Sequence, residues 1–328
     1  MTNNFLTCAN FGKGSIEVLI QVNPERLLLS GEYDAVRIQS FSINSVLPAF
    51  KQMYDFKTAY LYQMQVDFTF LGTGTSQGVP IIGCYCEVCS SKDPRDARLR
   101  SSILIQTASA RVIIDSGPDF RQQCLRAGLT HLDGLVITHE HKDHVAGLDD
   151  IRPFNFRSGK DMLVYATDSV QEALKREFHY IFRPNPYPGV PKVTLESIQE
   201  DPFVILGDRW WPLPVVHHKL PVLGFRIGGL AYITDANQFT DLALKRLQGV
   251  DVLVLNALRR ESHLSHFTLE EAIDWSKRIG ARQTYFTHIS HQLGKHSDVA
   301  LELPSGVFLA HDGLSGRTEG AEYRLDNP

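Results

Sequence analysis

The sequence LVITHEHKDH, at residues 135–144, decides how the rest of the chain is interpreted. Its first half is a short apolar and β-branched run, which is typical of a buried strand. Its second half brings together His139, His141, Asp143 and His144. His139 and His141 are separated by one residue, so their side chains can point the same way, toward one metal ion. Asp143 and His144 then turn back and can face a second ion. Imidazole together with carboxylate favours Zn, Mn or Fe over Ca or Mg.

Three further apparent strands end on the same kinds of side chain. His217 follows WPLPVV, Asp235 follows AYIT and His288 follows TYFT. Because open α/β folds place their sites at strand ends, we expect these residues to join the HEHKDH segment. An aspartate there can bridge two cations with its two oxygens, which a histidine cannot do. The adjacent pair His217 and His218 leaves open which of the two imidazoles faces a metal ion.

The five cysteines are unevenly placed. Cys8 and Cys124 stand alone, whereas Cys84, Cys86 and Cys89 lie close together. Three thiols so near one another cannot all pair among themselves, and a reducing compartment would not keep them paired. Metal ligation is the remaining common reason for such a cluster.

The segments around these residues predict an α/β fold. Apolar runs at 101–107 and 111–117 predict a hairpin, and a second hairpin is predicted to turn at Gly228-Gly229. A capping box at 268–271 predicts a helix through Ile279. Further strands and helices are expected at 132–138, 163–167, 169–178, 250–257 and 282–291, and a substrate-side loop at 182–191. Hairpins early and strand–helix units later predict two mixed sheets covered by helices on both outer faces.

Composition limits the function classes. The 37 acidic against 33 basic residues give a net charge of −4, so a broad basic face for nucleic acid is not indicated. Charged residues interrupt every apolar run before it reaches the roughly 18 residues of a membrane-spanning helix. The first residues lack a basic segment followed by an apolar one, so no secretory signal is expected. We therefore expect a cytoplasmic protein.

HEHKDH after LVIT, with the later His, Asp and His, resembles the metallo-β-lactamase superfamily. Three more segments are similar to its PhnP-like branch of phosphodiesterases: FLGTGTSQGVP (70–80), GCYCEVC (83–89) and THISHQ (287–292). The resemblance implies an αββα sandwich of two mixed sheets flanked by helices. It places this hydrolase domain at residues 64–314, after an N-terminal extension of unknown role (1–63) and before a C-terminal tail (315–328).

The resemblance also implies roles for individual residues. One divalent ion, Mn²⁺ or Zn²⁺, is expected on His139, His141 and His217. The second is expected on Asp143, His144 and His288, with Asp235 bridging the two. A separate structural Zn²⁺ is expected on Cys84, Cys86, Cys89 and His291, which agrees with the preference of three thiolates for a fourth soft or borderline ligand.

Two residues are expected to act in catalysis. His266, within SHLSHFTL, matches a non-ligand histidine of the family that meets the substrate phosphate, and an exposed loop histidine is the alternative. Asp143 is expected to orient the attacking water as well as bind metal. The implied reaction is hydrolysis of a small phosphodiester, cyclic ones included, by a nucleophile generated from water between two ions.

Two other functions are weighed against this one. A tRNA 3′-end processing endonuclease shares the HxHxDH motif but typically adds a basic, Gly/Pro-rich arm, and no such insert occurs in this chain. A non-catalytic PqqB-like binding protein shares the cysteine loop but has lost catalytic ligands, whereas all seven are present in this sequence. The expected partner is a small phosphodiester; nucleic acid is the less favoured alternative, no membrane partner is expected, and a homodimer is one expected assembly.

Overall fold

The computed structural model describes residues 5–7, 19–21 and 64–318. The chain divides into two compact units, Met1–Tyr60 and Leu61–Pro328. In the first unit, β1 (Phe5–Thr7) pairs antiparallel with β2 (Leu19–Gln21). The rest of the expected N-terminal extension lies outside the described residues.

The second unit contains a seven-stranded mixed sheet. Its strands, in spatial order, are β17 (Ser315–Arg317), β3 (Asp67–Gly72), β4 (Ser102–Gln106), β5 (Arg111–Ile114), β6 (Gly134–Val136), β7 (Met162–Ala166) and β8 (Val193–Ser197). The strands from β17 to β5 are antiparallel, and those from β5 to β8 are parallel. The hairpin predicted at 101–107 and 111–117 and the strands predicted at 132–138 and 163–167 therefore lie in this one sheet.

A second, eight-stranded mixed sheet packs against the first. Its strands, in spatial order, are β13 (Gln238–Phe239), β10 (Asp208–His217), β11 (Leu220–Ile227), β12 (Leu230–Ile233), β14 (Val252–Asn256), β15 (Gln283–Thr287) and β16 (Val307–Leu309), with β9 (Phe203–Ile205) also paired to β10. The strands from β12 to β16 are parallel, and the others are antiparallel. Hence the carboxyl ends of β12, β14 and β15 meet at one edge.

Three layers of apolar side chains hold the sandwich together. The middle layer lies between the sheets and contains Phe68, Trp210 and Tyr232. On β14, Val252 and Val254 face this middle layer, while Leu253 and Leu255 face the outer layer on the other side. This strand reads as a continuous apolar run because both of its faces are covered, as expected for a parallel strand.

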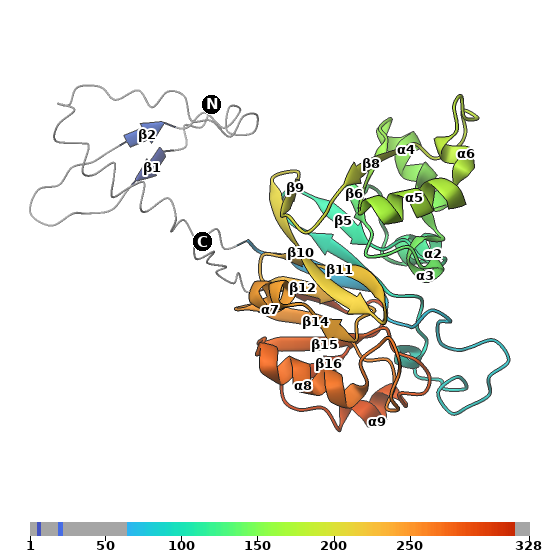
Figure 1. The fold of residues 1–328 in the computed structure, drawn as a ribbon, viewed down its shortest axis with the longest axis vertical. Coiled ribbons are helices and arrows are strands. Elements are labelled where there is room, and N and C mark those ends of the chain that lie inside the picture. The colour runs from blue at the N-terminus through green and yellow to red at the C-terminus, as the bar shows by residue number, and fades with distance from the viewer. Residues whose placement is uncertain (1–4, 8–18, 22–63, 319–328) are drawn as a thin grey trace, which may run out of the picture. The chain divides into compact units, whose positions relative to one another are not determined.

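Helices cover both outer faces of the sandwich (Figure 1). Those packed on the first sheet are α2 (Phe120–Arg126), α3 (Lys142–Val145), the 3₁₀ turn η3 (Leu148–Ile151), α4 (Arg152–Ser158), α5 (Asp168–Glu177) and α6 (His179–Phe182). Those packed on the second sheet are α7 (Asp241–Leu247), α8 (Leu269–Ile279) and α9 (His296–Ala300). A second 3₁₀ turn, η2 (Pro94–Asp96), follows the cysteine loop.

The predicted αββα architecture is confirmed. So is the capping box of α8, in which Thr268 and Glu271 bond each other's backbone, and the helix ends on Gly280 in the left-handed conformation. The expected C-terminal boundary differs from the structure. Residues 315–317, expected in a tail, form β17 on the edge of the first sheet, and Thr318 bonds Val66.

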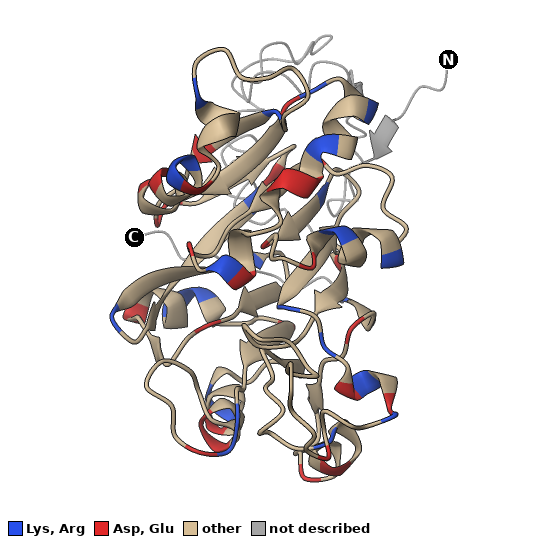
Figure 2. Cartoon of the chain, turned by 90° about the vertical axis from the view of Figure 1, so that its right-hand side faces the viewer, with Lys and Arg blue, Asp and Glu red and all other residues tan. Residues whose placement is uncertain are grey.

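In the part of the chain that the structure describes, no helix combines the length and apolarity needed to cross a membrane. Figure 2 shows basic and acidic residues interspersed along its helices and loops.

Candidate active site

The proposed ligands come from strand ends in both sheets. His139 follows β6, His141 caps the N-terminus of α3, and α3 itself carries Asp143 and His144. The second sheet supplies three residues, His217 at the end of β10, Asp235 after β12 and His288 after β15. Asp235 and His288 adopt left-handed backbone conformations, with φ of 53° and 56°. Such conformations are costly for residues with a Cβ and concentrate at functional sites.

The first donor group consists of His139, His141 and His217, whose ligand nitrogens all lie within 4.8 Å of one another. Nε2 of His139 is 3.0 Å from Nδ1 of His141. The sequence left open whether His217 or His218 belongs here. The structure places His217 in the group, while His218 is an exposed residue of the turn between β10 and β11.

The second donor group consists of Asp143, His144, Asp235 and His288. Nε2 of His144 lies 3.1 Å from an oxygen of Asp143 and 3.2 Å from an oxygen of Asp235. Despite this closeness, the buried Nε2 forms no hydrogen bond. Donor atoms that crowd together without bonding one another share a common target. The residues therefore fit a metal ion between them.

The outward-facing nitrogens of these imidazoles are held by hydrogen bonds. Nδ1 of His144 donates to Asp115 at 2.7 Å, and Nδ1 of His217 donates to the carbonyl of Ser265 at 2.8 Å. Nδ1 of His139 lies 3.0 Å from the hydroxyl of Thr138, which itself donates to Asp115. In each case the proton sits on Nδ1, so that Nε2 presents a lone pair to the centre, as in most protein metal sites.

Asp115 is a site residue that the sequence analysis missed. It is fully buried at the end of β5 and accepts hydrogen bonds from both His144 and Thr138. The signal was available, because RVIID ends on an aspartate just as AYITD does. Asn256, at the end of β14, was missed too; its amide bonds the backbone of Ala236, next to Asp235.

The electrostatics of the second group also favour a cation. Burial alone would lower the pKa of His144, but Asp143, Asp235 and Asp115 around it raise that pKa well above the ordinary histidine value. Conversely, burial would raise the pKa of Asp143, and the neighbouring His144 holds it below the usual range. The pKa values of Asp143 and Asp235 both lie below the usual range although the two groups are buried or nearly so, and charged carboxylates in such a place need positive charge beside them.

His266 lies between the two donor groups. Its ring centre is 4.6 Å from that of His217 and 4.8 Å from that of His288, and its Nδ1 is 3.8 Å from an oxygen of Asp235. It is buried, which excludes the exposed loop histidine, and Nδ1 has no hydrogen-bond partner. Burial is the main cause that lowers the pKa of His266 to about 2, so the imidazole is neutral.

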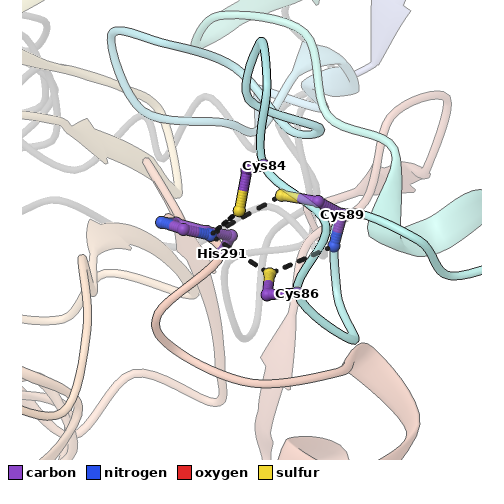
Figure 3. A group of neighbouring side chains, drawn as sticks. All are labelled: Cys84, Cys86, Cys89 and His291. Atoms are coloured by element: carbon purple, nitrogen blue, oxygen red, sulfur yellow. Dashed lines mark hydrogen bonds between the residues drawn. The ribbon is translucent and has the colours of Figure 1, made fainter.

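Cys84, Cys86, Cys89 and His291 form a separate cluster (Figure 3). Nδ1 of His291 lies 3.4, 3.3 and 3.6 Å from the sulfurs of Cys84, Cys86 and Cys89. In a tetrahedral zinc site, Zn–S of about 2.3 Å and Zn–N of about 2.0–2.1 Å place sulfur and nitrogen roughly 3.6 Å apart. The four side chains therefore fit one zinc ion.

A cavity of about 410 Å³ opens beside the first donor group. It is lined by His141, His217, His218, Lys219, Leu220, His263, Leu264 and Ser265. Among the described residues, Lys219 has no ion-pair partner. The lining of the cavity therefore includes one basic side chain, which forms no ion pair with a described residue.

Comparison with known proteins identifies the family. The model of the beta-lactamase superfamily domain matches residues 110–289, more than half of the chain. A crystal structure of a new diphosphatase from the PhnP family is 41% identical, with a TM-score of 0.73, and the match covers 77% of this chain and 97% of that one. The chain belongs to the PhnP family of the metallo-β-lactamase superfamily.

Two curated relatives of this PhnP-family chain carry other names. An octanoyltransferase of Porphyromonas gingivalis W83 is 42% identical over 258 residues, which make up 78% of this chain. The chain spans about half (52%) of that protein's length. A coenzyme PQQ synthesis protein B of Methylorubrum populi is 29% identical over 212 residues, 57% of this chain and 71% of the relative.

Proposed function

We propose that this PhnP-family domain is a metal-dependent hydrolase that uses two divalent ions to cleave a small phosphodiester. The observation that carries the proposal is the convergence of ligand-type atoms in two compact groups, above all the buried Nε2 of His144 between Asp143 and Asp235. An imidazole nitrogen that lies 3.1 and 3.2 Å from two carboxylate oxygens is the arrangement expected of ligands around one divalent ion.

The residues divide into two ligand sets. His139, His141 and His217 would hold one ion, and Asp143, His144 and His288 would hold the other; Asp235, which groups with the second set and also with His217, is proposed to bridge them. When bound, such a pair of ions lowers the pKa of water held between them and neutralises charge on the phosphoryl oxygens. The native metal is proposed to be Mn²⁺ or Zn²⁺, and the cysteine cluster is proposed to hold a structural Zn²⁺.

His266 is proposed to act on the substrate without binding metal. As a neutral imidazole it can donate one N–H to a phosphoryl oxygen or to the departing oxygen as negative charge develops there. Its place between His217 and His288 puts it beside both ion sites. Asp143 is proposed to orient the attacking water with the carboxylate oxygen that is not used for metal binding.

The cavity supports a small-molecule substrate. Its volume of about 410 Å³ lies near the lower end of the roughly 300–1,000 Å³ of typical ligand pockets. Nδ1 of His263 lies 3.3 Å from the amide nitrogen of Ser265, so it accepts that bond and leaves Nε2–H as a donor. With Lys219 at the rim, the cavity suits the polar or anionic group that leaves after cleavage.

Two observations weigh against the alternatives. Basic and acidic residues are interspersed and the net charge is −4, which does not favour a tRNA substrate. The seven expected ligands are all present and lie in two compact groups, which does not favour a binding protein without catalysis. The name of the PhnP-family relative, a diphosphatase, argues for including diphosphate bonds among the substrates tested.

The decisive experiment is turnover of a substrate panel by the full chain with its bound metals quantified. The panel contains linear phosphodiesters, cyclic phosphodiesters, diphosphate diesters and a precursor tRNA. The variant Asp235→Asn, purified in parallel, serves as the blank for contaminating phosphatases. We expect a small phosphodiester to be turned over by the parent chain alone. Cleavage of the precursor tRNA only, or no turnover by a chain with both ions bound, would contradict the proposal.

A further inference from the structure

His288 is the ligand whose position needs the most support. It follows β15 of the second sheet and has a left-handed backbone conformation. Its side chain meets residues of α3, a helix that packs on the first sheet. Its Nε2 lies 3.2 Å from an oxygen of Asp235, on the side where the donor atoms converge. Its other nitrogen, Nδ1, points away from that centre toward two hydroxyl groups.

Those hydroxyl groups belong to Ser101 and Thr234. The oxygen of Ser101 is 3.2 Å from Nδ1 of His288, and the oxygen of Thr234 is 3.4 Å from it. Each hydroxyl has one hydrogen and uses it elsewhere, since Ser101 donates to the carbonyl of Gly74 at 3.0 Å and Thr234 donates to Asp235 at 2.5 Å. Toward Nδ1, both oxygens can therefore only accept a hydrogen bond.

This arrangement selects one tautomer of His288. Because both neighbours of Nδ1 accept, the proton sits on Nδ1, and Nε2, which lies 3.4 Å from the hydroxyl of Thr75, keeps its lone pair. Ser101 is the nearer acceptor and is almost fully buried, at 1% exposed. Because its oxygen lies closer to Nδ1 than that of Thr234, Ser101 is the main acceptor for the imidazole.

The backbone around Ser101 is held firmly. Gly74 donates its N–H to the carbonyl of Leu99, while Thr75 and Thr73 exchange backbone hydrogen bonds with Ile289, next to His288. The chain can approach this closely only because residue 74 is glycine, since a Cβ there would lie 2.9 Å from the carbonyl oxygen of Arg98. The turn at 73–75 thus joins the segment of Ser101 to the segment of His288.

We propose that Ser101 is a positioning residue, which accepts the Nδ1 proton of His288 and so presents Nε2 to a divalent ion. The inference rests on the proposed function in one respect, that His288 is a metal ligand. Ser101 itself touches neither substrate nor metal. Its loss should therefore weaken metal binding and leave the chemistry of a fully loaded enzyme nearly unchanged.

The test is titration of the metal-depleted full chain with Mn²⁺, followed by electron paramagnetic resonance. Mn²⁺ is chosen because it avoids thiolate sites. For Ser101→Ala we expect one of two Mn²⁺ ions to bind roughly 10–100-fold more weakly, the usual effect of removing a partner of a ligand histidine. Ser101→Thr should restore the affinity, and kcat of Ser101→Ala should recover at saturating Mn²⁺. Ser276→Ala, which removes a buried hydroxyl bonded to Ile273 on α8, should change nothing.

A second measurement does not depend on whether the Ser101 variants fold. In the full chain with ¹⁵N-labelled histidine, the His288 signal, assigned by its loss in His288→Gln, should show the proton on Nδ1. A proton on Nε2 in the metal-depleted protein would overturn the inference. Unchanged Mn²⁺ binding by His288→Gln would instead overturn the ligand set of the proposed function. If His288→Gln weakens binding and Ser101→Ala does not, only the role of Ser101 is wrong.

Discussion

The two proposed metal sites of this chain are built in opposite ways. The ligands of the active site lie at the ends of strands, and hydrogen bonds that the imidazoles donate to Asp115, Thr138 and the Ser265 carbonyl orient their rings. The three cysteines of the other cluster lie on a loop that contains no strand or longer helix, the fourth residue, His291, follows β15, and the contacts of the sulfurs are mostly to His291 and to one another.

This difference predicts different consequences of metal loss. The active site is preorganised, so a lost ion should cost activity and leave the fold in place. The cysteine loop, by contrast, depends on its ion for its shape, because structural zinc contributes directly to folding free energy. Substitutions in each of the two sites test whether they differ in this way.

The largest effect is expected for Asp235→Asn. The amide keeps the size of the side chain but loses the charge that faces His144 and His288. We expect kcat/KM to fall by roughly 10³-fold or more, beyond the 10²–10³-fold effect of removing a single oxyanion donor. Metal analysis should show fewer bound ions, while the circular dichroism spectrum stays unchanged.

Asp208→Asn is the matched control, since Asp208 is a buried aspartate at the far end of β10 that bonds Thr107. It should retain activity. An Asp235→Asn variant with full activity and two bound ions would show that Asp235 is not the bridge.

A smaller loss is expected for His266→Ala. Because this imidazole is proposed to act on the substrate alone, kcat should fall by roughly 10²–10⁴-fold while both ions stay bound. Metal content and steady-state kinetics, measured on the same preparation, separate the possibilities. Loss of an ion would make His266 a ligand, as its closeness to His217 and Asp235 also permits. Unchanged kinetics would leave it without a catalytic role.

The sequence predicted the residues of the site better than the contacts that hold them. The β-branched runs that end on His139, Asp235 and His288 predicted strands, and the structure brings these side chains together. Their supporting partners follow no local pattern. Asp115 precedes His144 by 29 residues, and Ser101 precedes His288 by 187 residues, so only the folded sheets create these pairs.

The C-terminal edge strand escaped the sequence analysis for a similar reason. The family resemblance ended at residue 314, and SGR, at residues 315–317, has no alternating apolar residues that would indicate a strand, so the segment was expected to be part of a tail. The segment is held instead by backbone pairing with β3, by the ion pair of Arg317 with Asp67, and by the contact of Gly316 with the ring of Phe68. Backbone pairing at a sheet edge does not depend on an apolar pattern, which is why composition could not reveal it.

For the cysteine cluster we expect the opposite result, a loss of thermal stability without a loss of the active-site ions. Cys86 is exposed, and the hydrogen bonds from the backbone of Cys89 and from His291 lower its pKa to about 6, which favours the thiolate that zinc binds. For Cys86→Ser we expect loss of one zinc equivalent and a melting temperature several degrees lower, at about 2–4 °C for each kcal/mol lost. The active-site ions should remain bound.

The readouts for this variant are zinc content, thermal unfolding and kcat at saturating Mn²⁺. The control is Cys124→Ser, which removes the thiol of a buried cysteine on α2 that does not belong to the cluster. If Cys86→Ser kept its zinc and its melting temperature, the cluster would not be a structural zinc site.

The smallest effect is expected from removal of the segment before Met64, which contains none of the proposed ligands. The second compact unit begins at Leu61, and its first strand, β3, carries the fully buried Phe68 and Phe70. A chain that begins at Met64 keeps this strand and the contact of Met64 with Gly228 at the turn between β11 and β12. We expect its melting temperature to lie within about 2–4 °C of the full chain, a change of 1 kcal/mol or less, with metal content and kcat unchanged. A chain that begins at Gly72 lacks β3 and its core side chains and should not fold. Should the Met64 chain prove insoluble or inactive while the full chain works, residues 1–63 would belong to the hydrolase domain.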